Sequence, residues 1–150
     1  IRCPDGREIT VNSGGVPCVS GDPHRIEQAL RNLVDNALRH GRGDISLVAV
    51  PAPAGVELHV RDHGAGFPVD FVPHAFERFS RADDSRSAHG AGLGLSIVQA
   101  VALAHGGSAS VANATGGGAD VWLTLPHQPP ALQPSAAQFC ESDPPVSGPP

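Results

Sequence analysis

The chain has 150 residues, with 15 acidic and 10 basic side chains and a formal net charge of −5 at pH 7. An acidic chain without a basic run or interleaved aromatic residues is not typical of proteins that follow a nucleic-acid backbone, so we expect no nucleic-acid partner. All ten basic residues are arginine, which excludes a Walker-type phosphate loop because that loop needs a lysine.

The length allows one domain with a hydrophobic core. Prolines crowd the sequence from His127 onward, and apolar periodicity is lost there, a composition typical of disorder. We therefore predict a folded domain over residues 1–126 and a proline-rich disordered tail over residues 127–150. No apolar run reaches membrane-spanning length and no signal peptide is visible. We expect a cytoplasmic chain without membrane insertion of its own, which a missing segment or a partner could tether to the membrane.

The first elements are a hairpin, a short strand and a long helix. Residues 1–11 are predicted to form the hairpin, with its turn at Pro4-Asp5-Gly6, and residues 16–19 the short strand. Asp22 and Pro23 then mark a helix start, as N-cap and first helical residue. Apolar residues follow at helical spacing up to a predicted stop at Gly41, namely Ile26, Leu30, Leu33 and Ala37.

Two asparagines stand beside the apolar stripe of this helix. Asn32 and Asn36 are four residues apart, so they project from one face. They form either an amide pair satisfied by neighbouring backbone or a polar shelf for a hydrated cation and phosphates. Arg39 and His40, on the last turn, either reach a ligand or complement the negative end of the helix dipole.

Residues 44–50 and 56–61 alternate with the two-residue period of strands and predict a second hairpin. Its last strand leads into Asp62-His63-Gly64-Ala65-Gly66-Phe67-Pro68. This segment is either an ordinary Asp-x-Gly turn or a ligand site. In a ligand site the carboxylate would accept a hydrogen bond from an exocyclic amine, and the two glycines would let a flat ring lie against bare backbone.

A short helix is predicted over residues 71–79, which include Phe76-Glu77-Arg78-Phe79. Residues 80–89 are polar and lack periodicity, which is typical of a mobile loop. Arg81 and Arg86 in this loop are either solvated charges or contacts to phosphate.

A glycine-rich loop, Gly90-Ala91-Gly92-Leu93-Gly94, then runs into a helix that is predicted to end at Gly106-Gly107. Spaced glycines let the backbone approach a ligand, and the helix start offers free N–H groups and a positive dipole end to an anion. An isolated match of this kind also occurs as a plain tight turn. A final hairpin is predicted over residues 108–125, closing at Pro126.

In this order the motifs resemble the ATP-binding catalytic domain of bacterial sensor histidine kinases. The wider group, the GHKL superfamily, also holds gyrase-type topoisomerases, mismatch-repair ATPases, chaperone ATPases and anti-sigma-factor serine kinases. The resemblance covers nearly all of residues 22–126. It implies an α/β two-layer sandwich of the Bergerat type, in which helices cover one face of a mixed, largely antiparallel sheet. ATP would be held between helices and a flexible lid, which corresponds to residues 80–89.

The resemblance also implies roles for single residues, with ATP and Mg²⁺ as cofactors. Asn36 corresponds to the Mg²⁺ ligand, and Asn32 to its companion and the one candidate for a catalytic role. Asp62 corresponds to the aspartate that reads adenine. The other implied nucleotide contacts are Arg39, His40, Gly64, Gly66, Phe67, Arg81, Arg86, Gly90, Ala91, Gly92, Leu93, Gly94 and Leu95. Ala91 departs from the family, which usually has a hydroxyl or small polar residue there.

The chain differs from a whole histidine kinase in its histidines. None of the eight is followed by an acidic residue, which is the family's phosphoacceptor pattern. The implied function is therefore transfer of the γ-phosphoryl group of ATP to a histidine on a separate dimerisation domain or partner protein, with a response regulator downstream. Two alternatives stay open, namely an anti-sigma-type serine kinase and a nucleotide-dependent binding module without transfer.

Overall fold

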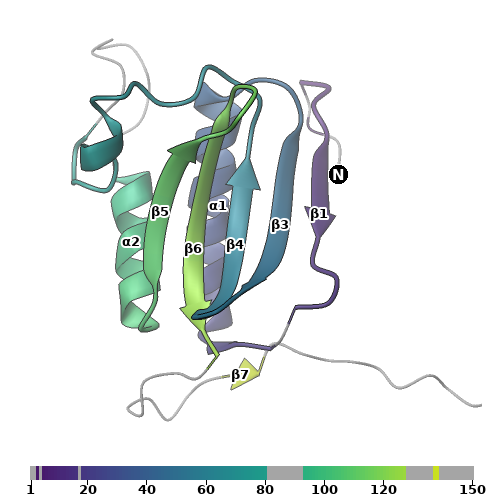
Figure 1. Cartoon of the computed structure of the whole chain (residues 1–150), viewed down its shortest axis with the longest axis vertical. Coiled ribbons are helices and arrows are strands. Elements are labelled where there is room, and N and C mark those ends of the chain that lie inside the picture. The colour runs from purple at the N-terminus through teal and green to yellow at the C-terminus, as the bar shows by residue number, and fades with distance from the viewer. Residues whose placement is uncertain (1–2, 4, 17, 81–92, 128–136, 139–150) are drawn as a thin grey trace, which may run out of the picture.

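The computed structural model describes residues 3, 5–16, 18–80, 93–127 and 137–138. One layer is a five-stranded sheet in the order β1-β3-β4-β6-β5, and α1 and α2 both cover the same face of it (Figure 1). The elements are β1 (Ile9–Asn12), β2 (Ser20–Gly21), α1 (Pro23–His40), β3 (Ile45–Ala52), β4 (Gly55–Arg61), a 3₁₀ turn (Val72–His74), α2 (Gly94–Ala104), β5 (Ser108–Asn113), β6 (Ala119–Pro126) and β7 (Ala137–Gln138).

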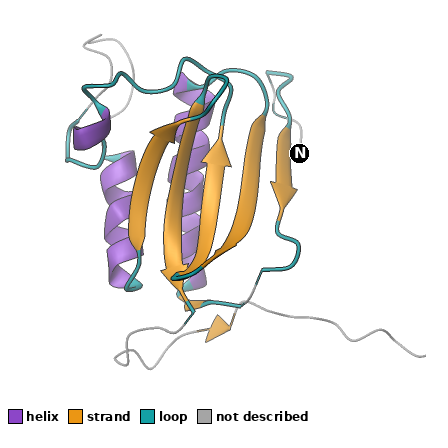
Figure 2. Cartoon of the chain, in the orientation of Figure 1, coloured by secondary structure: helices purple, strands orange, loops and turns teal. Residues whose placement is uncertain are grey.

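The predicted fold class, a two-layer α/β sandwich with a mixed and largely antiparallel sheet, is confirmed. Figure 2 shows the helices on one side of the strands. Only β1 runs parallel to its neighbour β3, whereas the β3–β4, β4–β6 and β5–β6 pairs are antiparallel. The hairpins predicted around residues 44–61 and 108–126 are present as β3–β4 and β5–β6.

Helix α1 begins and ends where the sequence predicts. The Asp22 carboxylate accepts hydrogen bonds from the backbone N–H groups of His24 (2.9 Å) and Arg25 (3.3 Å), and Pro23 is the first helical residue. Gly41 follows the helix and donates to the Ala37 carbonyl at 2.9 Å. Both ends are thus set by local chemistry, because these residues satisfy backbone groups that a helix leaves unpaired.

The core lies between the helices and the covered face of the sheet. Along β6, residues at alternate positions are buried, as a strand with one covered face requires. The buried stripe of α1 packs against them. The largest fully buried side chains are Leu33, Ile45, Val56, Val98, Leu123 and Leu125.

The described part of the hairpin predicted over residues 1–11 shows its turn, closed by the backbone N–H of Cys3, which donates to the Arg7 carbonyl at 2.8 Å. Residues 1, 2 and 4 of the predicted first strand lie outside the described residues. Within the turn, the backbone N–H of Gly6 donates to the Cys3 carbonyl at 3.0 Å. The chain after the turn forms β1 beside β3, with Ile9 opposite Ile45. This register places Ile9 against the buried core.

Two predicted elements differ from the structure. The strand predicted at residues 16–19 is instead the two-residue β2, which pairs with β7. The helix predicted over residues 71–79 is reduced to one 3₁₀ turn, and Phe79 has a positive φ of 65°. Most of the loop at 80–89 and of the tail at 127–150 lies outside the described residues. Among the helices of the described chain, none has the length and apolar character that a membrane crossing requires.

A histidine joins the end of α2 to the start of α1. Nε2 of His105 accepts a hydrogen bond from the backbone N–H of Asp22 at 3.0 Å, so Nδ1 carries the proton and donates to the Val101 carbonyl at 2.8 Å. The contact spans 83 positions of sequence. It therefore fixes the start of α1 relative to the end of α2, at the bottom of the helical layer in Figure 1.

We predict that His105→Ala destabilises the domain by about 1–2 kcal/mol, since the half-buried Asp22 N–H loses its acceptor. Urea denaturation would measure the change. His127→Ala, at an exposed position after β6, is the control and should stay within about 0.5 kcal/mol of the parent chain. Equal losses in the two variants would contradict the role of this hydrogen bond.

Candidate nucleotide site

A cavity of about 700 Å³ lies between α1, the segment that follows β4, and the start of α2. This volume is in the range of small-molecule sites, which are usually concave and combine apolar walls with a few placed polar groups. Three parts of the chain that are far apart in sequence form its walls.

The first wall is the second half of α1. Asn32, Asn36, Arg39 and His40 all line the cavity, as expected for residues three and four positions apart on one helix face. They lie beside the buried stripe that contains Leu33 and Ala37. The same helix therefore anchors itself in the core and presents amide and cationic side chains to the cavity.

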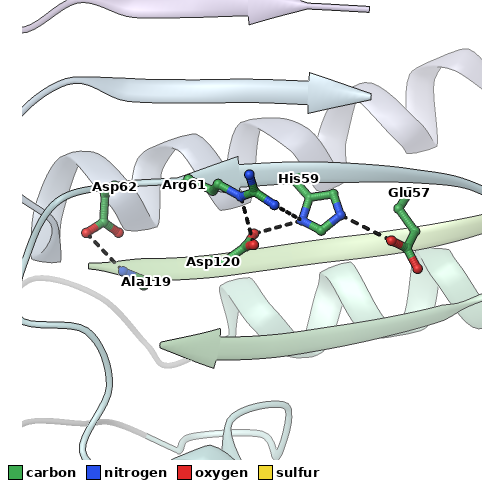
Figure 3. A network of polar contacts seen from close by, with 6 residues as sticks. All are labelled: Glu57, His59, Arg61, Asp62, Ala119 and Asp120. Atoms are coloured by element: carbon green, nitrogen blue, oxygen red, sulfur yellow. Dashed lines mark hydrogen bonds and ion pairs between the residues drawn. The ribbon is translucent and has the colours of Figure 1, made fainter. Parts of the chain in front are cut away.

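The second wall centres on Asp62, which directly follows β4. Its side chain is buried, with 7% of its surface exposed. Oδ1 accepts hydrogen bonds from the backbone N–H groups of Gly64 (2.7 Å) and Ala119 (3.4 Å), and Figure 3 shows the carboxylate reaching the start of β6. No residue among those described donates to Oδ2. This second oxygen is available to a ligand in the cavity, which Asp62 lines.

The loop after Asp62 is held by an asparagine from β5. The Asn113 amide accepts from the Phe67 N–H at 2.6 Å and donates to the Phe67 carbonyl at 2.9 Å. Gly66 has a φ of 75°, and a Cβ there would lie 2.5 Å from Asn113 Oδ1, so the position requires glycine. The Phe67 ring stacks on Phe71 with 5.5 Å between centroids. The loop thus offers bare backbone and an aromatic floor to the cavity.

The third wall is the start of α2. Leu93, Gly94 and Leu95 line the cavity, and no side chain of the described residues caps this helix end. A Cβ on Gly94 would lie 3.9 Å from Asn32 Oδ1, so the two helices are close here. The uncapped N–H groups and the positive dipole end of α2 therefore face the amide side chains of α1, an arrangement suited to an anion.

Three side chains of the α1 wall carry oxygen atoms that can act as metal ligands, namely Asn32, Asp35 and Asn36. Amide and carboxylate oxygens suit Mg²⁺, which keeps several waters and is often shared with substrate phosphates. Among the described residues, no group of three or more His, Cys, Asp and Glu could hold a metal ion. A cation at this wall would therefore take further ligands from water and from the bound molecule.

The structure brings together ten of the residues that the sequence predicts for the site: Asn32, Asn36, Arg39, His40, Asp62, Gly66, Phe67, Leu93, Gly94 and Leu95. Gly64 does not line the cavity but donates to Asp62. Arg81, Arg86, Gly90, Ala91 and Gly92 lie outside the described residues. Sequence reasoning missed Asp35, Gly41, Ala65, Pro68, Phe71, Ala75, Ser80, Ile97 and Ala119, which also line the cavity.

A separate polar network lies on the uncovered face of the sheet. The two ring nitrogens of His59 contact Asp120 (2.8 Å) and Glu57 (3.2 Å), and Arg61 donates to Asp120 at 2.8 Å (Figure 3). The His59 ring also stacks on Trp122. Because these side chains alternate with Val60 and Asp62, which point to the helices, the network stabilises β4 against β6 and does not reach the cavity.

Comparison with known proteins agrees with this arrangement. Residues 21–129 match the family described as histidine kinase-, DNA gyrase B- and HSP90-like ATPases. The chain is 41% identical over 138 residues to the sensor histidine kinase component HK1 of Mycobacterium tuberculosis, covering 92% of this chain and 82% of that protein. It is 43% identical over 109 residues to the signal transduction histidine-protein kinase AfsQ2 of Streptomyces coelicolor.

Solved structures are similar too. The mycobacterial sensor histidine kinase MprB superposes with a TM-score of 0.70 at 33% identity, over 81% of this chain and 84% of that one. The ATP-binding domain of PrrB from Mycobacterium tuberculosis gives a TM-score of 0.65 at 34% identity, over 83% and 82%. The match covers 72% of this chain but only 20% of AfsQ2, so this chain corresponds to one part of that longer kinase.

We predict that Asn113→Ala loosens the loop that carries Gly66 and Phe67. Each lost hydrogen bond is worth about 1 kcal/mol, so exchange of the Phe67 amide should accelerate at least about fivefold. Hydrogen exchange followed by NMR would measure it. Asn12→Ala, whose side chain bonds only to the nearby Gly14 N–H among the described contacts, is the control. An unchanged Phe67 exchange rate would contradict this role.

Proposed function

Because the chain belongs to the family of histidine kinase-, DNA gyrase B- and HSP90-like ATPases and is the ATP-binding catalytic domain of a sensor histidine kinase, we propose that it binds ATP with Mg²⁺ in this cavity. We further propose that it donates the γ-phosphoryl group to a histidine of a separate dimerisation domain or partner protein, in the cytoplasm. The observation that carries the proposal is the buried Asp62 carboxylate facing the amide side chains of α1 across one cavity.

Asp62 would read the adenine. One carboxylate oxygen is committed to the backbone N–H groups of Gly64 and Ala119, and the other would accept a hydrogen bond from the exocyclic amine. The ring would lie against the backbone at Gly66, beside the stacked Phe67 and Phe71. Guanine would be disfavoured because it presents a carbonyl oxygen where adenine presents the amine.

The phosphates would extend between the two helices. The N–H groups at the start of α2 would donate to phosphate oxygens, and the Arg39 and His40 side chains would supply positive charge from α1. Asn36, with Asn32 as companion, would hold the Mg²⁺ ion, which neutralises phosphate charge when it is bound. Phosphoryl transfer needs positioning and charge stabilisation, so the cavity requires no nucleophile of its own.

The accepting histidine would approach along the gap between α1 and α2. A hollow of about 360 Å³ borders the cavity there, and Asn32 and Ile97 line both. In-line transfer needs the acceptor nitrogen within roughly 3–3.5 Å of the reacting phosphorus. Among the described residues, Asn32 is the polar side chain that lines both the cavity and this hollow, and we propose it as the candidate for a catalytic role.

The two other functions considered from the sequence are less well supported. HK1 is named as a sensor histidine kinase component and AfsQ2 as a signal transduction histidine-protein kinase, which favours histidine over serine as the acceptor. A nucleotide-dependent binding module would hold its nucleotide with the same groups around this cavity, so the names of the relatives are what favours the kinase over it.

We predict that Asp62→Asn weakens ATP and ADP binding equally and at least about tenfold, or about 1.4 kcal/mol. The amide oxygen can keep the bonds to Gly64 and Ala119, whereas the amide nitrogen would face the adenine amine, donor against donor. GTP should compete better with the variant than with the parent chain. Titration of a fluorescent ATP analogue, with ATP, ADP and GTP as competitors, measures the three affinities. Asp70→Asn, at an exposed position of the same segment, is the control. An unchanged affinity would contradict the assignment.

The transfer itself is tested by incubating the chain with labelled ATP, alone and with a dimerisation-helix partner that contains a phosphoacceptor histidine. We expect no label on this chain alone and acid-labile label on the partner. Asn36→Ala should abolish the labelling because it removes the proposed metal ligand. Acid-stable label would favour the serine kinase, and binding without any transfer would favour the binding module.

A further inference from the structure

We propose that Arg7 is a positioning residue for the nucleotide cavity. It lies outside the cavity and holds the last turn of α1, which forms part of the cavity wall, through the backbone carbonyls of that turn. This inference rests on the proposed function, because it concerns the affinity of the same cavity for ATP. Arg7 itself does not line the cavity. It precedes residues 21–129, which match the family.

The Arg7 guanidinium spans the carbonyl end of the helix. Nη2 donates to the Leu38 carbonyl at 2.6 Å, and Nη1 lies 3.4 Å from the Ala37 carbonyl and 3.5 Å from that of Gly41. The last four carbonyls of a helix have no partner within the helix, and a cation at this end interacts favourably with the helix dipole. Arg7 therefore adds, from another segment, to the local bond by which the Gly41 N–H already satisfies the Ala37 carbonyl.

The arginine is itself held in place. Its Nε donates to Asp5 Oδ2 at 2.6 Å, its backbone N–H donates to Asp5 Oδ1 at 3.2 Å, and only 19% of its side-chain surface is exposed. The bond from the Arg7 backbone, followed by that from its guanidinium, lowers the pKa of Asp5 from its ordinary value. Asp5 is therefore ionised at neutral pH and keeps the guanidinium oriented towards the helix.

The segment around Arg7 is also fixed to the chain that follows α1. The Glu8 N–H donates to Asp44 Oδ1 at 2.8 Å, and the Ile45 N–H donates to the Glu8 carbonyl at 2.9 Å. The backbone at Arg7 is thus held in place, because β1 begins two residues later and pairs with β3 in the sheet. A displacement of this segment would be transmitted to the last turn of α1.

That last turn carries part of the cavity wall. Arg39, His40 and Gly41 line the cavity, and their neighbours Ala37 and Leu38 provide the carbonyls that Arg7 binds. A binding constellation must be held within about 0.5 Å of its productive geometry. Without the Arg7 contacts the final turn would fray, and the side chains proposed to face the phosphates would lose their fixed positions.

Coupling between the Arg7 contact and the nucleotide must be reciprocal. If Arg7 strengthens ATP binding, ATP must in turn stabilise the Arg7 contact. Amide protection at Arg7 and Glu8 should therefore increase when nucleotide binds, although neither residue lines the cavity.

The test compares Arg7→Ala, Arg7→Lys and Arg25→Ala with the parent chain. Arg25 lies at the other end of α1 and is exposed, so its variant is the matched control. We expect Arg7→Ala to raise the Kd for a fluorescent ATP analogue about tenfold, as for the loss of charge-assisted hydrogen bonds. Arg7→Lys should recover part of the affinity because an ammonium group can still donate to the Leu38 carbonyl, and Arg25→Ala should leave the Kd unchanged.

Hydrogen exchange separates positioning from general destabilisation. We expect faster exchange at Gly41 in Arg7→Ala with unchanged exchange at Val121 and Leu123 in β6. A folded Arg7→Ala variant with the parent Kd, or a uniform rise of exchange across the domain, would overturn the inference. A parent chain that binds no ATP analogue would instead refute the proposed function. These two failures are therefore distinguishable.

Discussion

The architecture of the site depends on how the buried carboxylate of Asp62 is satisfied. A carboxyl group in a residue with 7% of its surface exposed requires hydrogen-bond partners. Oδ1 takes two backbone donors, Gly64 from the following loop and Ala119 from the start of β6. These bonds turn the chain sharply after β4 and register it against β6. The second oxygen accepts no hydrogen bond from a described residue, so one arrangement satisfies the fold and leaves an acceptor in the residue that lines the cavity.

The parts of this arrangement that could be predicted from sequence are those set by neighbouring residues. Asp22 and Pro23 place the start of α1, and the spacing of Asn32 and Asn36 places both on the face that lines the cavity. The two antiparallel hairpins follow from period-two alternation. Each of these signals acts within a few residues, so its physical cause is visible in the sequence itself.

The parts that could not be predicted depend on partners far away in the chain. The parallel pairing of β1 with β3 joins segments 36 positions apart, and Asn113 binds the Phe67 backbone across 46 positions. The sequence predicts Gly41 only as a helix stop. Its φ of −78° suits any residue, but a Cβ there would lie 2.5 Å from Asp62 Cγ. The glycine is required by close approach, which only the three-dimensional structure reveals.

The charges around the cavity also constrain how a triphosphate could bind. Within the described part of the chain, Arg39 and His40 are the only basic side chains that line it, and both belong to one turn of α1. On the opposite side, the start of α2 offers backbone N–H groups. Together they correspond to a positive charge of about half an elementary unit. A nucleotide with several negative charges would exceed what these groups neutralise. The proposed Mg²⁺ ion at Asn36 would therefore supply much of the missing positive charge, so that ATP affinity would depend on the divalent cation more than on any single side chain.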